Sequence, residues 1–141
     1  MPVQWTEQMR TGHPTIDSDH MQLVEIINLV EQAVIERNLV RADQIIFALL
    51  AYVSGHFARE EAIQQQIGFP DCATHKQKHA IMTAFSTHLE GQIRDASTDS
   101  RKLACLSQLQ DALGDWLIKH ILDEDMKMLP YLGRSAGVSA A

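Results

Sequence analysis

The sequence predicts an all-α protein, an up-down-up-down four-helix bundle with an irregular N-terminal arm. Three observations predict this class: apolar residues recur at helical spacing in four long segments, short polar links separate these segments, and no segment alternates as a strand does. The 141 residues, 45% of them hydrophobic, are enough for one domain with a substantial core. We therefore expect a single bundle domain over residues 1–133 and a flexible tail over residues 134–141.

The N-terminal arm covers residues 1–16, where no apolar period is sustained. Glycine and proline in this segment favour an irregular path. Trp5 and Ile16 are the side chains expected to pack the arm on the domain. His13 lies between a glycine and a proline, so we expect a solvated surface histidine there.

The first helix has Asp17 or Ser18 as its expected N-cap and extends to about Arg37. His20 lies in its first turn, three residues before Leu23, and so shares the apolar face. The other apolar residues of that face are Ile26, Ile27, Val30 and Val34. This helix therefore directs one histidine towards the core.

The second helix is expected from about Arg41 to Ile67. His56 and Glu60 continue its apolar stripe, because positions 49, 53, 56 and 60 follow the helical period. Glu61 points away from this stripe, and we expect it to be solvated. The apolar residues of the stripe are Ile45, Ile46, Leu49, Leu50, Val53 and Phe57.

The link Gly68–Asp71 can end the second helix at its glycine and cap the third at its aspartate. The third helix is expected from about Cys72 to Arg94. His75 and His79 are four residues apart, which turns the chain by about 400° and places both side chains on one face. That face continues through Met82, Ser86 and Leu89.

The fourth helix is expected from about Arg101 to Leu129, with Pro130 ending it. Its inner face holds His120 one turn after Trp116 and Leu117. The apolar residues before these are Leu103, Leu106, Leu109 and Leu113.

Composition restricts the possible partners and location. The formal net charge of −6, without a basic stripe, argues against a nucleic-acid partner and against an anionic membrane surface. No apolar run is long enough to span a membrane, and the N-terminus does not resemble a signal peptide. We expect a cytoplasmic monomer in which Cys72 and Cys105 are free thiols.

Five histidines are in phase with the expected core: His20, His56, His75, His79 and His120. Burying five imidazoles with Glu60 would be unfavourable without a shared partner, and metal ions supply one. The set exceeds the needs of one tetrahedral zinc and suits two octahedral-type ions joined by carboxylates, with iron matching the donors. Spacing alone selects Asp123 or Glu124 as the second bridge, since Asp125 is turned about 140° from the face of His120.

Four motifs carry these residues: Ile16-Asp17-x-x-His20, His56-Phe57-x-x-Glu60-Glu61, Gly68-Phe69-Pro70 before His75-x-x-x-His79, and Trp116-Leu117-x-x-His120-Ile121-x-x-x-Asp125. Together they resemble the hemerythrin family, over a stretch from Trp5 to about Asp125. The resemblance implies a non-haem di-iron centre with an oxo or hydroxo bridge that binds O2 reversibly. It implies a role in oxygen storage, delivery or sensing.

The resemblance also implies a role for each ligand. His75, His79 and His120 would hold one iron, and His20 and His56 the other, which keeps an open position. Glu60 and Asp125 would bridge the two ions. Asp125 rather than Glu124 is then the second bridge, which requires the fourth helix to widen locally as a π-type turn.

An apolar pocket beside the open position is expected from Leu23, Phe57, Trp116 and Leu117. Gln64 is a further pocket candidate, because it stands where the family often has methionine and its amide can hold water near the open iron. We expect a binding protein and not an enzyme, since five histidines against two carboxylates favour carriage. The alternative is a di-iron oxidase or a peroxide-reducing enzyme on the same ligands. Sensing would require an unidentified protein partner.

Overall fold

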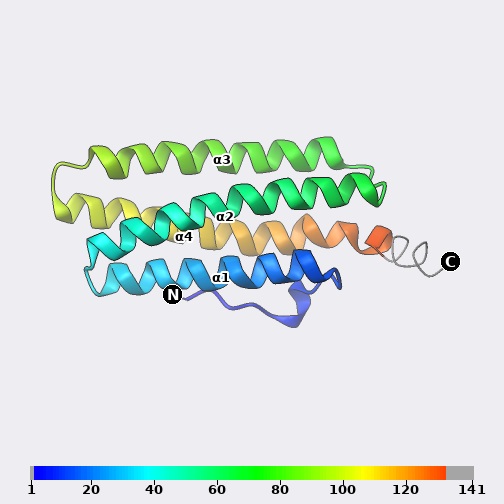
Figure 1. Ribbon diagram of the computed structural model, residues 1–141, viewed down its shortest axis with the longest axis horizontal. Helices are drawn as coiled ribbons and strands as arrows, with labels where there is room; N and C mark the ends of the chain where they lie inside the picture. The colour runs from blue at the N-terminus through cyan, green and yellow to red at the C-terminus, as the bar shows by residue number, and fades with distance from the viewer. Residues whose placement is uncertain (1, 133–141) are drawn as a thin grey trace.

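A computed structural model describes residues 2–132 of the chain, so the tail expected over residues 134–141 lies outside the described residues. Its four long helices form a bundle (Figure 1): α1 spans Pro14–Ile35, α2 Leu39–Gln66, α3 Cys72–Asp95 and α4 Asp99–Asp123. Two short 3-10 helices, η1 (Glu7–Met9) and η2 (Asp125–Met128), precede α1 and follow α4. No strand occurs in residues 2–132, so the all-α prediction is confirmed. Within this part of the chain, no helix combines the length and apolar character needed to cross a membrane.

Successive helices run antiparallel along one long axis (Figure 1). Helix α1 packs on α2 and α4, and α3 packs on the same two helices. This is the predicted up-down-up-down arrangement. The beginnings of α1 and α3 and the ends of α2 and α4 consequently gather at one end of the bundle.

Helix α1 begins earlier than the sequence suggests. Its N-cap is His13, and Pro14 takes the first helical position, where proline's missing N–H is no disadvantage. The expected cap at Asp17 or Ser18 is therefore wrong. Asp17 instead turns inward and accepts hydrogen bonds from the backbone N–H and the hydroxyl of Thr11, both at 2.8 Å. These bonds hold the arm against α1.

Side-chain caps also start α2 and α4 about two residues before their expected positions. The Asn38 side chain accepts a hydrogen bond from the N–H of Arg41 at 3.1 Å. The Thr98 hydroxyl does the same for Arg101 at 3.1 Å. Each bond satisfies an N–H of the first turn that has no partner within its helix.

The link between α2 and α3 follows the expectation closely. Gly68 has φ of 69°, a left-handed conformation that glycine adopts without strain. Asp71 occupies the N-cap position of α3, but its side chain makes no capping hydrogen bond. The two helices are therefore joined by a tight turn that keeps their neighbouring ends together.

The end of α4 differs from the expected continuous helix. Helix α4 ends at Asp123, Glu124 has φ of −112° and ψ of −52°, and η2 then tightens the chain into 3-10 geometry. The expected π-type widening is wrong. Helical conformation resumes over residues 129–132, so Pro130 does not end the helical segment as expected. A proline in the first turn of a new helical stretch lacks only an N–H that would be unpaired anyway.

Two apolar clusters fill the interior. The larger one lies in the body of the bundle and draws on all four helices. The smaller one lies at the end where α2 meets α3 and consists of Ile16, Ile63, Ile67, Phe69 and Met128. Between the two clusters lies a layer of buried polar side chains.

Candidate metal centre

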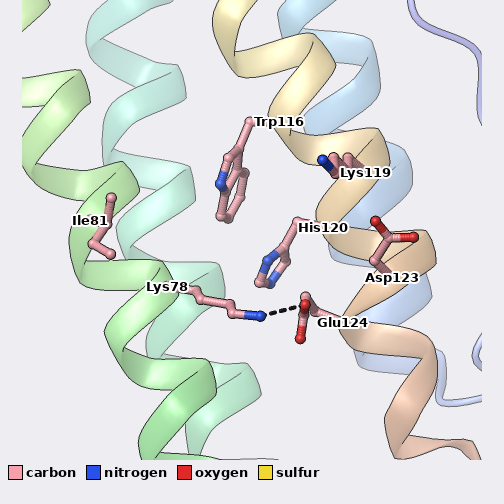
Figure 2. Close-up of a pocket in the computed structure, with 7 residues that line it drawn as sticks. All are labelled: Lys78, Ile81, Trp116, Lys119, His120, Asp123 and Glu124. Carbon is pink, nitrogen blue, oxygen red and sulfur yellow. Dashed lines mark hydrogen bonds and ion pairs between the residues drawn. The ribbon is translucent and has the colours of Figure 1, made fainter.

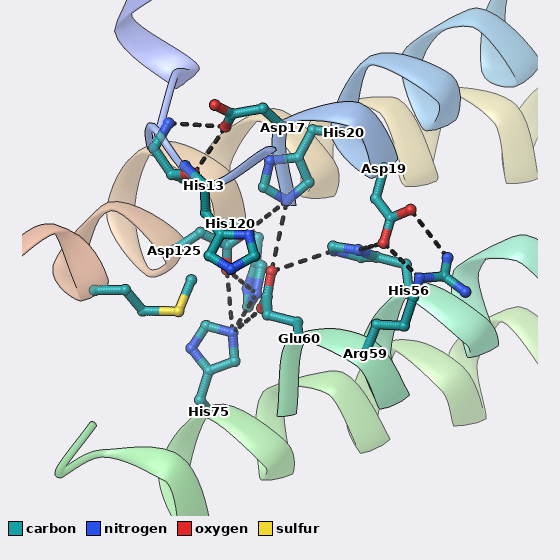
Figure 3. A network of polar contacts seen from close by, with 12 residues as sticks. His13, Asp17, Asp19, His20, His56, Arg59, Glu60, His75, His120 and Asp125 are labelled. Atoms are coloured by element: carbon teal, nitrogen blue, oxygen red, sulfur yellow. Dashed lines mark hydrogen bonds and ion pairs between the residues drawn. The ribbon is translucent and has the colours of Figure 1, made fainter. Parts of the chain in front are cut away.

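Seven potential metal ligands meet in this polar layer, and six of them are labelled in Figure 3. All are at most 5% exposed. Histidine and carboxylate side chains are rarely buried to this degree unless they are paired or bind a metal. Helix α1 contributes His20, α2 His56 and Glu60, α3 His75 and His79, α4 His120, and η2 Asp125.

The ligand atoms form two groups that share Glu60 and Asp125. One group adds three histidines, His75, His79 and His120, and the other adds two, His20 and His56. Within each group the ligand atoms lie within 4.8 Å of one another. The layer therefore has two positions that could each hold a cation.

Glu60 directs one carboxylate oxygen to each group. Its Oε1 lies 2.7 Å from His75 Nε2 and 3.3 Å from His79 Nε2. Its Oε2 lies 3.3 Å from His56 Nε2 and 3.6 Å from His20 Nε2. A carboxylate in this position can bridge two metal ions.

Asp125 is arranged in the same way. Its Oδ1 lies 3.1 Å from His75 Nε2 and 3.0 Å from His120 Nε2. Its Oδ2 lies 3.0 Å from His20 Nε2. The break after α4 makes this possible. A continuous helix would direct Asp125 away from the layer, whereas η2 turns it inward.

The donor set fits metal ions on its own chemistry. His20 Nδ1 is buried without a hydrogen-bond partner. His20 Nε2, His79 Nε2, Glu60 Oε2 and both oxygens of Asp125 lie close to other ligand atoms, but none of these contacts has the geometry of a hydrogen bond. His75 and His120 bring their Nε2 atoms within 3.1 Å of each other. Buried nitrogen and oxygen lone pairs that converge in this way are satisfied by cations, and imidazole with carboxylate suits iron.

The two carboxylates of the layer favour the protonated form of nearby histidines. Burial alone would lower the pKa of His20 and His75, but contacts with Asp125 and Glu60 outweigh it and raise both pKa values to about 9. Burial would raise the pKa of Glu60, yet its contacts with histidines, His20 foremost, hold that pKa well below the usual range. The layer is therefore built to stabilise positive charge next to its two carboxylates.

The sequence profile described as the hemerythrin HHE cation binding domain matches residues 11–132. The chain belongs to the hemerythrin family. The matched segment includes all seven buried ligand candidates.

Individual relatives cover most of the chain at low identity. A bacteriohemerythrin of Stenotrophomonas maltophilia is 26% identical over 123 residues, 86% of this chain and 75% of the relative. A bacteriohemerythrin of Ralstonia nicotianae is 27% identical over 135 residues, 95% of this chain and 92% of the relative. A hemerythrin-like protein of Naegleria gruberi is 25% identical over 126 residues, 89% of this chain and 90% of the relative.

Two carboxylates outside the layer orient histidines of this hemerythrin-family site. Asp19 Oδ2 lies 2.9 Å from His56 Nδ1, and Glu61 Oε2 lies 3.0 Å from His79 Nδ1. The expectation that Glu61 is solvated is wrong, because the antiparallel packing of α2 and α3 brings His79 to it. Sequence reasoning does not single out Asp19. Its only signal is an acidic residue beside His20, and its contact depends on how α1 packs on α2.

A small apolar cavity lies one helical turn inward from the ligands. Its volume is about 10 Å³, at the lower limit of what a single water molecule needs. The structure brings together here the four apolar pocket candidates of the sequence analysis. The lining residues are Leu23, Ile27, Val53, Phe57, Met82, Leu113, Trp116 and Leu117.

Gln64 is the one pocket candidate that lies elsewhere. It is fully buried on the outward side of the ligand layer, where its Nε2 donates to Met128 Sδ at 3.5 Å and its Oε1 has no partner. It follows Glu60 by four residues on α2, whereas Phe57 and Val53 precede Glu60. Gln64 therefore faces the smaller apolar cluster and does not line the cavity.

A second hollow lies at the surface between α3 and α4, and His120 is one of the residues that line it (Figure 2). Trp116 stacks on His120 with ring centroids 4.3 Å apart. Lys78 of α3 pairs with Glu124 across this hollow, and Lys127 also contacts Glu124 at 3.1 Å. Neither Asp123 nor Glu124 enters the ligand layer, so the choice that ideal helical spacing favours is wrong.

The two remaining histidines lie outside the site. His88 is exposed, as expected. His13 is half-buried rather than solvated, because the early start of α1 draws it against the domain. Cys72 and Cys105 are free thiols, as expected.

Proposed function

We propose that this hemerythrin-family chain holds two iron ions in its buried layer and binds O2 reversibly there. The observation that supports this most is the inequality of the two ligand groups, three histidines against two, around a shared pair of carboxylates. If both ions take the same coordination number, the two-histidine position has one ligand fewer and can accept an external one. Two ferrous ions would supply the electrons that reversible O2 binding uses.

The surrounding side chains favour binding over reduction of the bound molecule. The cavity beside the ligands is lined only by apolar side chains, which exclude bulk water and offer no proton. Phe57 and Trp116 also stack on the ligand rings of His79 and His120, at 3.9 Å and 4.3 Å between centroids, and so fix their orientation. We therefore propose a carrier, store or sensor of O2 and not an enzyme.

The alternative is a di-iron oxidase or a peroxide-reducing enzyme on the same ligands. Such chemistry needs a proton source beside the bound oxygen species, and the apolar cavity lining favours the carrier. The two proposals differ in one measurable property, the return of O2. An oxidase or peroxide-reducing enzyme consumes the bound molecule, whereas a carrier releases it.

The experiment begins with metal analysis of the purified full-length chain after loading with iron. We expect two iron ions per chain. The protein is then reduced without air and its optical spectrum is recorded after air is admitted and again under vacuum. A new absorption band that disappears under vacuum and returns with air supports the proposal. One iron per chain, or a spectrum that never reverts, would contradict it.

A further inference from the structure

We propose that Asp19 is the positioning residue of the two-histidine metal position, acting through His56. Arg59 and Tyr52 hold Asp19 in place for this purpose. The inference rests on the proposed metal binding, but not on O2 binding.

The contact between Asp19 and His56 determines which ring nitrogen is free. Asp19 Oδ2 lies 2.9 Å from His56 Nδ1, while His56 Nε2 faces the ligand layer, 3.3 Å from Glu60 Oε2 (Figure 3). A carboxylate can only accept, so Nδ1 carries the hydrogen in this pair. The lone pair of Nε2 is then available to a metal ion, and the negative carboxylate makes it a stronger donor.

Three further hydrogen bonds fix the orientation of Asp19. Arg59 donates from Nε to Oδ2 at 2.9 Å and from its terminal nitrogen to Oδ1 at 3.0 Å. The Tyr52 hydroxyl donates to Oδ1 at 2.8 Å. Asp19 is itself only 5% exposed. A carboxylate held by a planar guanidinium fork and a hydroxyl has little freedom to turn away from the imidazole.

The two metal positions differ in this outer support. At the two-histidine position, His20 has no hydrogen-bond partner at Nδ1. The only histidine of that position whose Nδ1 contacts a carboxylate is His56, and the carboxylate is that of Asp19. At the three-histidine position, Glu61 contacts His79 at 3.0 Å, but its side chain is 23% exposed and its neighbour Lys76 is 4.0 Å away. Loss of the Asp19 carboxylate should therefore weaken metal binding at the two-histidine position. Loss of the Glu61 carboxylate should weaken metal binding at the three-histidine position by less.

The test compares Asp19→Asn with Glu61→Gln, two substitutions that keep shape and remove charge. Metal-free full-length protein is titrated with Co(II), and the absorption spectrum reports each ion as it binds. We expect Asp19→Asn to lower the affinity for one of two ions by about 10- to 100-fold and to leave the other unchanged. Glu61→Gln should produce a smaller loss, on the other ion. Arg59→Gln should lower the affinity for the same ion as Asp19→Asn does, but by a smaller factor.

A second readout separates positioning from general stability. In the zinc-loaded protein, the Nδ1–H proton of His56 should give a slowly exchanging NMR signal. We expect this signal to shift and to exchange faster in Asp19→Asn, because a neutral amide oxygen is a weaker acceptor than a carboxylate, and to stay unchanged in Glu61→Gln. Unchanged affinity for both Co(II) ions in Asp19→Asn would overturn the inference. So would an equal loss at both positions together with a lower melting temperature. Because the probes are cobalt and zinc, failure to bind O2 would leave this result intact.

Discussion

Asp125 and Glu124 are neighbours in the chain with opposite surroundings. Asp125 is fully buried among three ligand histidines, whereas Glu124 pairs with two lysines near the surface. We expect Asp125→Ala to reduce the bound metal sharply, because both metal positions lose an oxygen ligand. Glu124→Ala should retain the metal and change stability by less than about 1 kcal/mol, as for other exposed ion pairs. Metal analysis after identical loading distinguishes them, and the reverse ranking would exclude Asp125 as the bridge.

Gln64 is a second residue whose substitution has a clear direction. Its buried Oε1 has no partner and its amide contacts only a methionine sulfur. A buried polar atom without a hydrogen bond destabilises the folded state by about 1–3 kcal/mol. We therefore expect Gln64→Met to raise the free energy of unfolding by about 1 kcal/mol, measured by urea denaturation. The exposed neighbour serves as control, since Gln65→Met should have no effect. A destabilised Gln64→Met protein would show that the amide is satisfied.

At the residue scale, helical phase predicts most of the site and fails at two aspartates. His20, His56, Glu60 and the other ligand histidines all follow the apolar periods of their helices. Asp125 does not, because it belongs to a 3-10 turn that phase cannot anticipate. Only the family resemblance indicates it. The role of Asp19 cannot be predicted from helical phase for another reason. Its contact with His56 joins α1 to α2, and the sequence does not specify how these two helices are rotated relative to each other.

The N-terminal arm is the element whose attachment depends most on one side chain. Asp17 is 4% exposed and accepts hydrogen bonds from Thr11 and from the N–H of Gly12. Asp17→Ala leaves these donors without a partner, so we expect a loss of about 1–3 kcal/mol in the free energy of unfolding. Asp71→Ala is the matched control because that side chain makes no capping bond, and it should change stability little. Equal effects in urea denaturation would show that the arm is not held by Asp17.

Helix boundaries show where sequence patterns are reliable. Helix α3 begins at Cys72 as predicted, because a glycine–proline link allows few alternatives. The start of α1 and the end of α4 differ by several residues. In both places an aspartate that looks like a cap or a helical residue forms tertiary contacts instead. At both places, tertiary contacts at the end of the bundle that holds the ligand layer override the local helix propensity.

The whole molecule is organised as three successive layers at that end. An apolar cavity lies on the inner side, the histidines and carboxylates form the middle, and a small apolar cluster with Gln64 closes the outer side. All four helices contribute side chains to the middle layer, so an ion bound there would link the four helices to one another. We therefore expect bound metal to stabilise the fold, and we expect both stability and metal binding to depend on pH.

The metal-free protein should lose stability as pH rises above neutrality. His20 and His75 have folded-state pKa values of about 9, whereas an unfolded histidine titrates near about 6.5. Between these values the folded chain binds more protons than the unfolded chain. The stability that these protons contribute is thus fully present below about pH 6.5 and is lost as the pH rises towards 9. Glu60 and Asp125, whose pKa values are lowered, add a loss of stability only when the pH falls below about 4.

Bound metal should remove this alkaline loss. Cations hold the ligand histidines in their neutral form, so the folded, metal-loaded chain no longer carries the extra protons, and metal competes better with protons as pH rises. We expect urea denaturation between pH 6.5 and 9 to show decreasing stability for chelator-treated protein and constant or increasing stability for zinc-loaded protein. Parallel curves would mean that the histidine layer does not bind metal. A flat curve for the metal-free protein would mean that its histidines are not paired with the two carboxylates.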